Sequence, residues 1–118
     1  MRMSTNDGEN RRRYRRVKVK LPLKIAKSYA SVYADGHTVD LSLGGARAIL
    51  TQHFSSYSQV FLKLFSLDGS LSLDVEGRVL WIKSMPEGKE LHYLSGLQFM
   101  NLHTEEGKKI IQQLMKEK

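Results

Sequence analysis

The sequence predicts a mostly β fold, a small antiparallel β-barrel of about six strands with a C-terminal α-helix packed on it. Two observations support this fold class. Apolar and polar residues alternate through most segments between residues 17 and 99, which is typical of strands with one buried and one exposed face. Helical spacing of apolar residues occurs only beyond residue 104. The length of 118 residues suits a single domain with its own core.

The first strand is expected over residues 17–25, where every odd position is apolar and lysines fill most even positions. Pro22 falls on the outward register, and its missing N–H donor suits an edge or a bulge. A second strand is expected over residues 28–34, followed by a hairpin turn at Asp35-Gly36 and a return through Thr38 and Val39.

The later strands follow the same alternation. Residues 46–51 are expected to be extended, as are residues 60–65, and Asp68-Gly69 supplies a hairpin turn into a long strand over residues 71–84. One face of that long strand should carry Leu71, Leu73, Val75, Val79 and Trp81. Residues 85–90 contain Pro86 and Gly88 and predict a turn before a last strand over residues 91–99. The barrel should therefore end at about residue 102.

The C-terminal segment predicts a helix over about residues 104–117. Thr104 is a suitable N-cap, and Glu105 and Glu106 suit the positive end of the helix dipole. Lys116 and Lys118 suit its negative end. The apolar stripe of this helix consists of Ile110, Ile111, Leu114 and Met115.

The positive charge is concentrated at the N-terminus. The chain has 19 basic and 12 acidic residues, a formal net charge of +7. Residues 1–20 carry eight basic and two acidic residues, whereas the other 98 residues carry 11 and 10. Residues 1–10 are polar and without periodicity, so we expect a flexible arm before a domain over residues 11–118.

Several classes of protein are disfavoured by composition. The absence of cysteine excludes disulfides, thiolate nucleophiles and cysteine-based metal sites. Neither a signal peptide nor a membrane-spanning segment is evident, which favours a cytoplasmic protein. The four histidines stand alone, and no catalytic or nucleotide-binding loop motif occurs. We therefore expect neither an enzyme nor a bound metal or cofactor.

Two motifs carry chemistry. The run from Arg11 to Arg16 offers planar guanidinium groups that bind phosphate bidentately and stack on rings, although it could equally be an arm that binds any polyanion. The segment from Asp40 to Gly45 contains adjacent glycines that allow a ligand close to the backbone, although a structural turn would need the same residues. The Asp40 carboxylate could accept hydrogen bonds from a guanine edge.

Together the two motifs resemble the PilZ family of bacterial cyclic di-GMP receptors, whose signature is Arg-x-x-x-Arg before the first strand followed by Asp/Asn-x-Ser-x-x-Gly. Here Arg12-Arg13-Tyr14-Arg15-Arg16 and Asp40-Leu41-Ser42-Leu43-Gly44-Gly45 match these motifs. The segments 78–81 and 94–99 are similar to later strands of the family. The resemblance runs from about residue 11 to the C-terminus.

The resemblance implies a stand-alone PilZ domain that binds the second messenger cyclic di-GMP. It assigns phosphate and guanine-face contacts to Arg12 and Arg16, a guanine edge to Asp40 and Ser42, and close backbone approach to Gly45. Arg47 matches a position where family members often carry a ligand-binding arginine, although an exposed strand residue would look the same. The neighbouring residues Arg11, Arg13 and Gly44 are weaker candidates.

The implied function is a receptor whose ligand orders the arginine-rich arm and which signals to an unidentified protein in motility, biofilm or exopolysaccharide control. The alternatives are a PilZ-like adaptor that binds no nucleotide, or a basic barrel that binds RNA or DNA. The nearly neutral body argues against nucleic acid. A monomer and a homodimer fit the sequence equally well.

Overall fold

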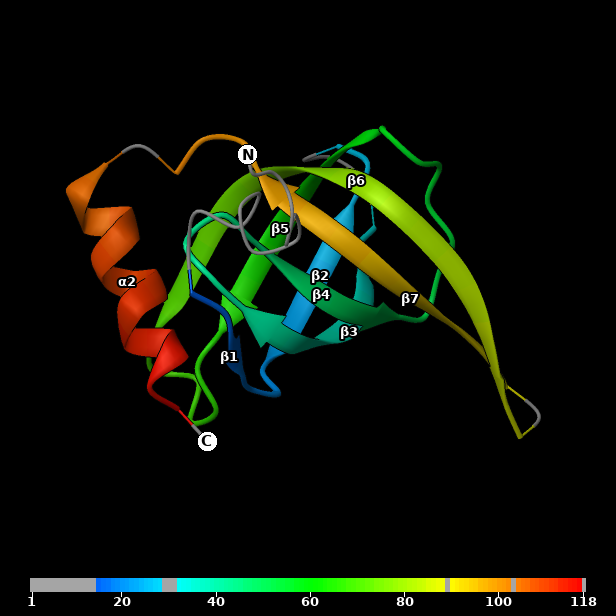
Figure 1. The fold of residues 1–118 in the computed structure, drawn as a ribbon, viewed down its shortest axis with the longest axis horizontal. Helices are drawn as coiled ribbons and strands as arrows, with labels where there is room; N and C mark the ends of the chain where they lie inside the picture. The colour runs from blue at the N-terminus through cyan, green and yellow to red at the C-terminus, as the bar shows by residue number, and fades with distance from the viewer. Residues whose placement is uncertain (1–14, 29–31, 89, 103, 118) are drawn as a thin grey trace, which may run out of the picture.

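Seven strands and one helix make up the described part of the chain (Figure 1). This is a computed structural model, and it describes residues 15–28, 32–88, 90–102 and 104–117. The elements are β1 (Val17–Lys18), β2 (Pro22–Ala26), β3 (Ala34–Leu41), β4 (Gly45–Leu50), β5 (Gln59–Phe65), β6 (Ser72–Glu87), β7 (Glu90–Phe99) and α2 (Glu105–Met115).

Strands β2 to β7 close into an antiparallel ring. The pairings run from β2 to β3, β4, β7, β6 and β5, and β5 pairs with β2 again. The short β1 pairs only with β3, beside β2. Within the ring, closure gives each of the six strands a partner on both sides. The expected six-stranded barrel with a C-terminal helix is confirmed.

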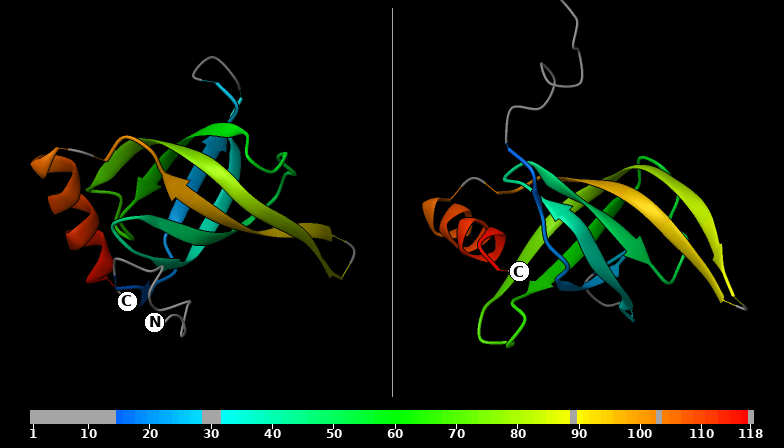
Figure 2. Two further views of the ribbon diagram at one scale, coloured as in Figure 1. Left: turned by 45° about the horizontal axis from the view of Figure 1, so that its top comes forward. Right: turned by 60° about the horizontal axis from the view of Figure 1, so that its bottom comes forward.

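The inward positions of the strands form one apolar core. Leu23, Leu50, Leu62 and Val79 come from four different strands and are at most 2% exposed. Figures 1 and 2 show α2 against one end of the barrel, while β6 and β7 extend together past the other end as a hairpin. From the helix, Ile111 and Leu114 join the core, and Ile110 and Met115 pack against it, as the apolar stripe predicts.

The first strand is split instead of running unbroken from residue 17 to 25. Between β1 and β2 the regular ladder is interrupted, and the buried Thr38 hydroxyl replaces the ladder partners of two backbone groups. That hydroxyl donates to the Val19 carbonyl at 2.5 Å and accepts from the Leu21 N–H at 2.9 Å. Pro22 directly follows the break and is exposed, in agreement with the expected bulge or edge position.

The expected hairpin turn at Asp35-Gly36 is wrong, because both residues lie inside β3. Asp35 pairs with Lys24 across the β2–β3 ladder. A Cβ on Gly36 would lie 2.7 Å from the Ile49 carbonyl oxygen, so the glycine permits close strand packing instead of a turn. The expected strand over 28–34 overlaps β3 only at Ala34 among its described residues, since residues 29–31 lie outside them.

The later hairpins differ in detail from the expectation. The Asp68-Gly69 turn is confirmed, and Gly69 has a φ of 78°. The β6–β7 turn is tighter than expected, because β6 continues to Glu87 and the turn falls at Gly88, which has a φ of 62°. Trp81 does not share the buried face of Val79. A bulge between these two residues reverses the alternation and leaves the Trp81 side chain exposed.

The helix begins as expected and ends slightly earlier. The Thr104 hydroxyl accepts from the Gly107 N–H at 3.0 Å, which is N-cap geometry. The helix ends at Met115 with Lys116 as its C-cap. No basic residue lies within its last turn, and Lys118 is outside the described residues. Of the two lysines expected at the negative end of the helix, the structure therefore places only Lys116, at the C-cap.

Candidate ligand-binding site

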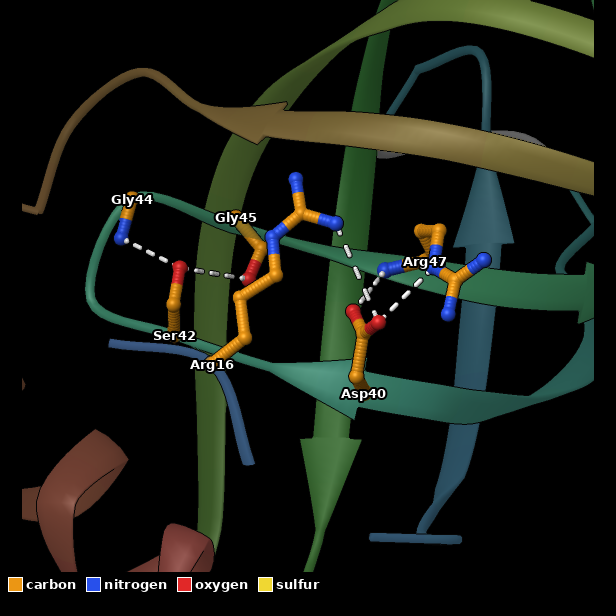
Figure 3. Close-up of polar contacts among 6 residues, drawn as sticks. All are labelled: Arg16, Asp40, Ser42, Gly44, Gly45 and Arg47. Carbon is orange, nitrogen blue, oxygen red and sulfur yellow. Dashed lines mark hydrogen bonds and ion pairs between the residues drawn. The ribbon is translucent and has the colours of Figure 1, made fainter. Parts of the chain in front are cut away.

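The centre of the candidate site is the carboxylate of Asp40, near the end of β3. Its side chain is only 6% exposed. One oxygen, Oδ1, accepts from the backbone N–H of Arg47 at 3.1 Å, and Oδ2 accepts from Arg47 Nε at 2.7 Å (Figure 3). The charge-assisted pair fixes the guanidinium of Arg47 on β4 beside the carboxylate.

A bulge in β3 brings these two residues together. The β3–β4 register pairs Thr38 with Ala48, and after the irregularity it pairs Asp40 with Arg47. Val39 is therefore the extra residue. Without this shift Asp40 would fall one position out of step with β4. The sequence motif alone gives no sign of the bulge, so the Asp40–Arg47 contact was not predicted.

Arg16 approaches the same carboxylate from the residues just before β1. Its Nη1 lies 3.8 Å from Asp40 Oδ2, which is an ion-pair distance and too long for a hydrogen bond. Its side chain is 39% exposed. The β1–β3 pairing of Lys18 with Asp40 places Arg16 at this point of the barrel. Arg16 is thus held more loosely than Arg47.

Ser42 and Gly44 form the tight connection between β3 and β4. The Ser42 N–H donates to the Gly45 carbonyl at 2.9 Å, and Ser42 Oγ accepts from the Gly44 N–H at 3.1 Å. The Gly44 carbonyl in turn accepts from the Phe99 N–H at 2.9 Å, which ties the connection to the end of β7. The hydroxyl of Ser42 therefore organises the loop beside Asp40 (Figure 3).

Gly45 has a packing role that the sequence did not reveal. A Cβ at this position would lie 2.1 Å from the Leu97 carbonyl oxygen, so the backbone of β7 occupies the space that a side chain would need. The predicted role of Gly45 in admitting a ligand remains a prediction. The requirement for glycine here already follows from the close approach of β4 and β7.

The register places Trp81 in line with this site. Asp40 pairs with Arg47, Arg47 with Gly96, and Gly96 with Trp81, which makes one row across β3, β4, β7 and β6. The indole of Trp81 covers Gly96, since a Cβ on that glycine would lie 2.4 Å from the indole Nε1. Sequence reasoning missed Trp81 because the bulge that turns it outward leaves no mark in the alternation. We refer to Asp40, Arg47, Gly96 and Trp81 as the site row.

Only part of the predicted arginine run falls within the described residues. Arg11, Arg12 and Arg13 lie outside the described residues. A hollow of about 490 Å³ lies beside β1, and its lining includes Val17, Lys18 and Val39 but neither Arg16 nor Asp40. It adjoins the site along the chain without containing its charged groups.

The described residues contain neither a metal-binding cluster nor a helix suited to a membrane. No group of three or more histidine, cysteine, aspartate or glutamate side chains could hold a metal ion in the part of the chain that is described. Among the same residues, no helix has the length and apolar character needed to cross a membrane.

The fold and the site define a class of protein, small closed antiparallel barrels with a terminal helix and a cationic cluster around one buried carboxylate. A family model described as "PilZ domain" matches residues 10–116. The chain therefore belongs to the PilZ family.

Solved structures give the same fold. The chain is similar to the cyclic di-GMP-bound PilZ domain of YcgR from Escherichia coli, with a TM-score of 0.68 and 18% identity, covering 89% of this chain and 88% of that one. It is also similar to the inhibitor of motility MotI/DgrA from Bacillus subtilis, with a TM-score of 0.64 and 18% identity, covering 87% and 48%. Apo MrkH from K. pneumonia is similar with a TM-score of 0.65 and 13% identity, and the match covers 86% of this chain and 47% of that one.

These matches differ in how much of each protein they cover. The chain spans about half the length of MotI/DgrA and of MrkH. At identities below one fifth, the likeness establishes the fold alone. No curated protein matches the sequence.

Proposed function

We propose that this PilZ domain is a receptor for cyclic di-GMP. The observation that carries the proposal is the Asp40 carboxylate with Arg16 and Arg47 converging on it at the barrel surface. The motif match over Arg12, Arg16, Asp40, Ser42 and Gly45 supports it, as does the fold shared with the cyclic di-GMP-bound domain of YcgR.

The chemistry of the ligand suits these groups. Cyclic di-GMP has two phosphate charges and two guanine bases, so its receptor needs cations, stacking surfaces and an acceptor for guanine N–H groups. Each guanidinium has five N–H donors, more than Asp40 engages. The carboxylate has about four lone-pair positions and can accept further hydrogen bonds beyond those from Arg47. The site can therefore bind anion and base together.

The two described arginines should act differently. Arg47 is held to Asp40 by its backbone N–H and by its Nε, and its guanidinium offers a plane on which a guanine can stack. Arg16 is held only by a longer ion pair and can move onto a phosphate at small cost. We propose that Arg12 joins Arg16 at the phosphates, and that binding orders the arginine-rich arm.

Trp81 adds an aromatic surface at the far end of the site row. Its exposed indole lies over Gly96, next to Arg47 in the register. A base that stacks on the guanidinium of Arg47 would extend toward this indole. Base–aromatic stacking contributes about 1–3 kcal/mol per base. We therefore include Trp81 in the proposed site.

Isothermal titration of the full chain with cyclic di-GMP tests the proposal. We expect binding at micromolar or lower concentration and at least a tenfold loss of affinity in Arg16→Ala. Lys24→Ala is the matched control, because Lys24 is an exposed cation that pairs with Asp35 on another part of the barrel. Cyclic di-AMP, which has the same phosphates without guanine, should not bind. Absence of heat with cyclic di-GMP would reject the receptor function.

The single tryptophan gives an independent readout, because it lies in the proposed site. We expect saturable quenching of its fluorescence by cyclic di-GMP. In calorimetric titration, which needs no tryptophan, we expect weaker binding by Trp81→Ala than by Trp81→Phe. Equal affinities for the two variants would remove Trp81 from the site.

The biological output is the finer part of the proposal. A PilZ domain with no catalytic motif in its sequence would act through a second protein. The names of two similar proteins, an inhibitor of motility and a transcription regulatory factor, indicate the kinds of process that such domains serve. We propose control of motility, biofilm formation or exopolysaccharide synthesis through a protein partner.

A further inference from the structure

Three large hydrophobic side chains are exposed together where β6 leaves the barrel. Tyr57 is 74% exposed, and Leu80 and Trp81 are each 39% exposed. The Tyr57 N–H donates to the Val79 carbonyl at 2.5 Å, and the Val79 N–H donates to the Ser58 carbonyl at 3.0 Å. These bonds extend the pairing beyond the last β5–β6 ladder pair and place the backbone of Tyr57 beside the peptide that joins Val79 to Leu80. We call Tyr57, Leu80 and Trp81 the aromatic patch.

The backbone is irregular on both sides of the patch. Tyr57 has a φ of 68° and is the one non-glycine residue with positive φ in the described ranges. Such a conformation costs about 1–3 kcal/mol for a residue with a side chain. Opposite it, the bulge between Val79 and Trp81 interrupts the β6–β7 register. Both irregularities present apolar side chains to solvent, which a purely structural turn does not require.

Two cations flank the patch on the same face of the sheet. Arg78, Trp81 and Lys83 pair with Gln98, Gly96 and Leu94, which are successive outward positions of β7. Arg78 and Lys83 are both exposed. Exposed tyrosine and tryptophan beside arginine are the composition of protein-interface hot spots.

The charge around the patch favours a protein over a nucleic acid. Residues 21–118 carry 11 basic and 10 acidic residues, and Glu76, two residues before Arg78, accepts from Gln59 at 3.1 Å. Nucleic acids are bound through several phosphate contacts, and the two cations that flank the patch are few for that purpose. Two cations around an aliphatic and aromatic centre instead match a short acidic segment with an apolar side chain at its middle.

We propose that the aromatic patch is a docking surface for a partner protein, and that the partner contributes an acidic segment with a central apolar anchor. The anchor packs on Leu80 and Tyr57, and its flanking carboxylates pair with Arg78 and Lys83. Trp81 belongs to both this patch and the site row, so the docking surface adjoins the proposed ligand site. The patch itself does not depend on cyclic di-GMP binding.

Selection from a random 12-residue peptide display library on the full chain, with and without cyclic di-GMP, tests the docking surface. We expect enriched peptides with an apolar residue among aspartates and glutamates. Synthetic versions of these peptides should bind the wild-type chain in fluorescence anisotropy. Their affinity for the Leu80→Ser and Tyr57→Ser variants should be about tenfold lower or weaker still, as is typical when a hot-spot residue is truncated. Arg78→Glu should weaken them further at low salt.

Leu67→Ser is the matched control, because Leu67 is 53% exposed but lies in the β5–β6 turn. It should leave peptide affinity unchanged, and circular dichroism should show all variants folded. Failure to enrich any peptide, a basic consensus, or equal affinity in Leu80→Ser and wild type would overturn the proposal. The proposal would also be overturned if a 12-nucleotide oligothymidine bound in a manner that depends on Leu80 while the peptides did not bind. The selection without cyclic di-GMP keeps this outcome separate from failure of the receptor function.

Discussion

At the scale of single residues, Asp40 connects the site to the fold. Its side chain is nearly buried, and its two oxygens face the guanidinium groups of Arg16 and Arg47 and the backbone N–H of Arg47. Buried carboxylates are tolerated where they are paired and hydrogen-bonded. The cost of burying this charge is therefore offset by the two arginines that the proposed ligand requires.

Replacement of Asp40 by alanine should affect both stability and binding. The Arg47 N–H would lose its acceptor, which costs about 1–3 kcal/mol in the free energy of unfolding. We also expect at least a tenfold loss of cyclic di-GMP affinity, because the Arg47 guanidinium would no longer be held in place. Urea unfolding and calorimetric titration measure the two effects.

Asp35→Ala is the control for this substitution. Asp35 forms its ion pair with Lys24 at the surface, where such pairs contribute little. It should change stability by less than about 1 kcal/mol and leave ligand affinity unaltered. Equal effects of the two alanine variants would contradict the special role of Asp40.

The residue scale also shows what sequence reasoning could and could not find. The Asp40 and Ser42 motif was visible because its spacing is local. The partners of Asp40 depend on the β3–β4 register, and that register depends on the Val39 bulge. Trp81 was placed on the wrong face for the same reason, since one extra residue in β6 inverts the alternation.

At the scale of elements, one side-chain hydroxyl completes the hydrogen bonding at the junction of β1 and β2, where Val19 and Leu21 each also keep one backbone hydrogen bond to β3. Thr38 bridges the Val19 carbonyl and the Leu21 N–H while fully buried. The strand pattern in the sequence continued through this junction, because both sides of the break are apolar at alternate positions. A threonine side chain that replaces ladder hydrogen bonds cannot be inferred from such a pattern.

Thr38→Val keeps the shape of the side chain and removes its hydroxyl. Two buried backbone groups would lose their partner, so we expect a loss of about 1–3 kcal/mol in the free energy of unfolding. Thr51→Val is the control, because the Thr51 hydroxyl bonds the Asp35 carbonyl at an exposed position. Chemical denaturation of the two variants should separate them clearly, and similar losses would argue against the bridge.

The β5–β6 turn is sensitive to acid. The Asp68 carboxylate accepts hydrogen bonds from the backbone N–H of Ser70, from the Ser70 hydroxyl and from the Ser66 hydroxyl. These bonds favour the charged form and lower the pKa of Asp68 from 3.8 to about 2. Because the folded pKa lies below the unfolded value, the turn is stabilised fully above pH 3.8. That stabilisation is lost as the pH falls toward about 2.

Carbon-13 NMR of the Asp68 carboxyl should therefore show a titration midpoint near 2. Asp68→Asn should flatten the dependence of unfolding free energy on pH over the same interval, since the asparagine does not titrate. A midpoint at the ordinary value of 3.8 would show that the three hydrogen bonds do not favour the charged form.

At the scale of the whole molecule, the ring of six strands and the helix share one core. The fold class was predictable because alternation and helical spacing are properties of whole segments and survive single irregularities. The errors fell at local irregularities inside strands. Asp35-Gly36, for example, resembled a turn but lies within β3, where Gly36 allows close packing against Ile49. Close approaches of this kind involve residues distant in sequence.

Removal of the helix contact tests this shared core. Leu114 is fully buried, so Leu114→Ala should cost about 2–5 kcal/mol in the free energy of unfolding. Gln113→Ala, at an exposed position of the same helix, should cost less than about 0.5 kcal/mol. A single transition in the Leu114→Ala variant, by both circular dichroism and tryptophan fluorescence, would indicate that helix and barrel unfold together. Two separate transitions would contradict the shared core.

The position of β1 outside the ring has a consequence for the lifetime of a complex. Two register pairs, Val17–Leu41 and Lys18–Asp40, join β1 to β3, and the Val19 N–H adds a bond just beyond them. This short segment can therefore detach while all six barrel strands stay hydrogen-bonded to one another. Arg16 would leave Asp40 in the same movement. Dissociation of a ligand held by Arg16 should then follow the peeling of one short strand, and amide exchange at Val19, which donates to the Val39 carbonyl, should slow when the ligand is bound.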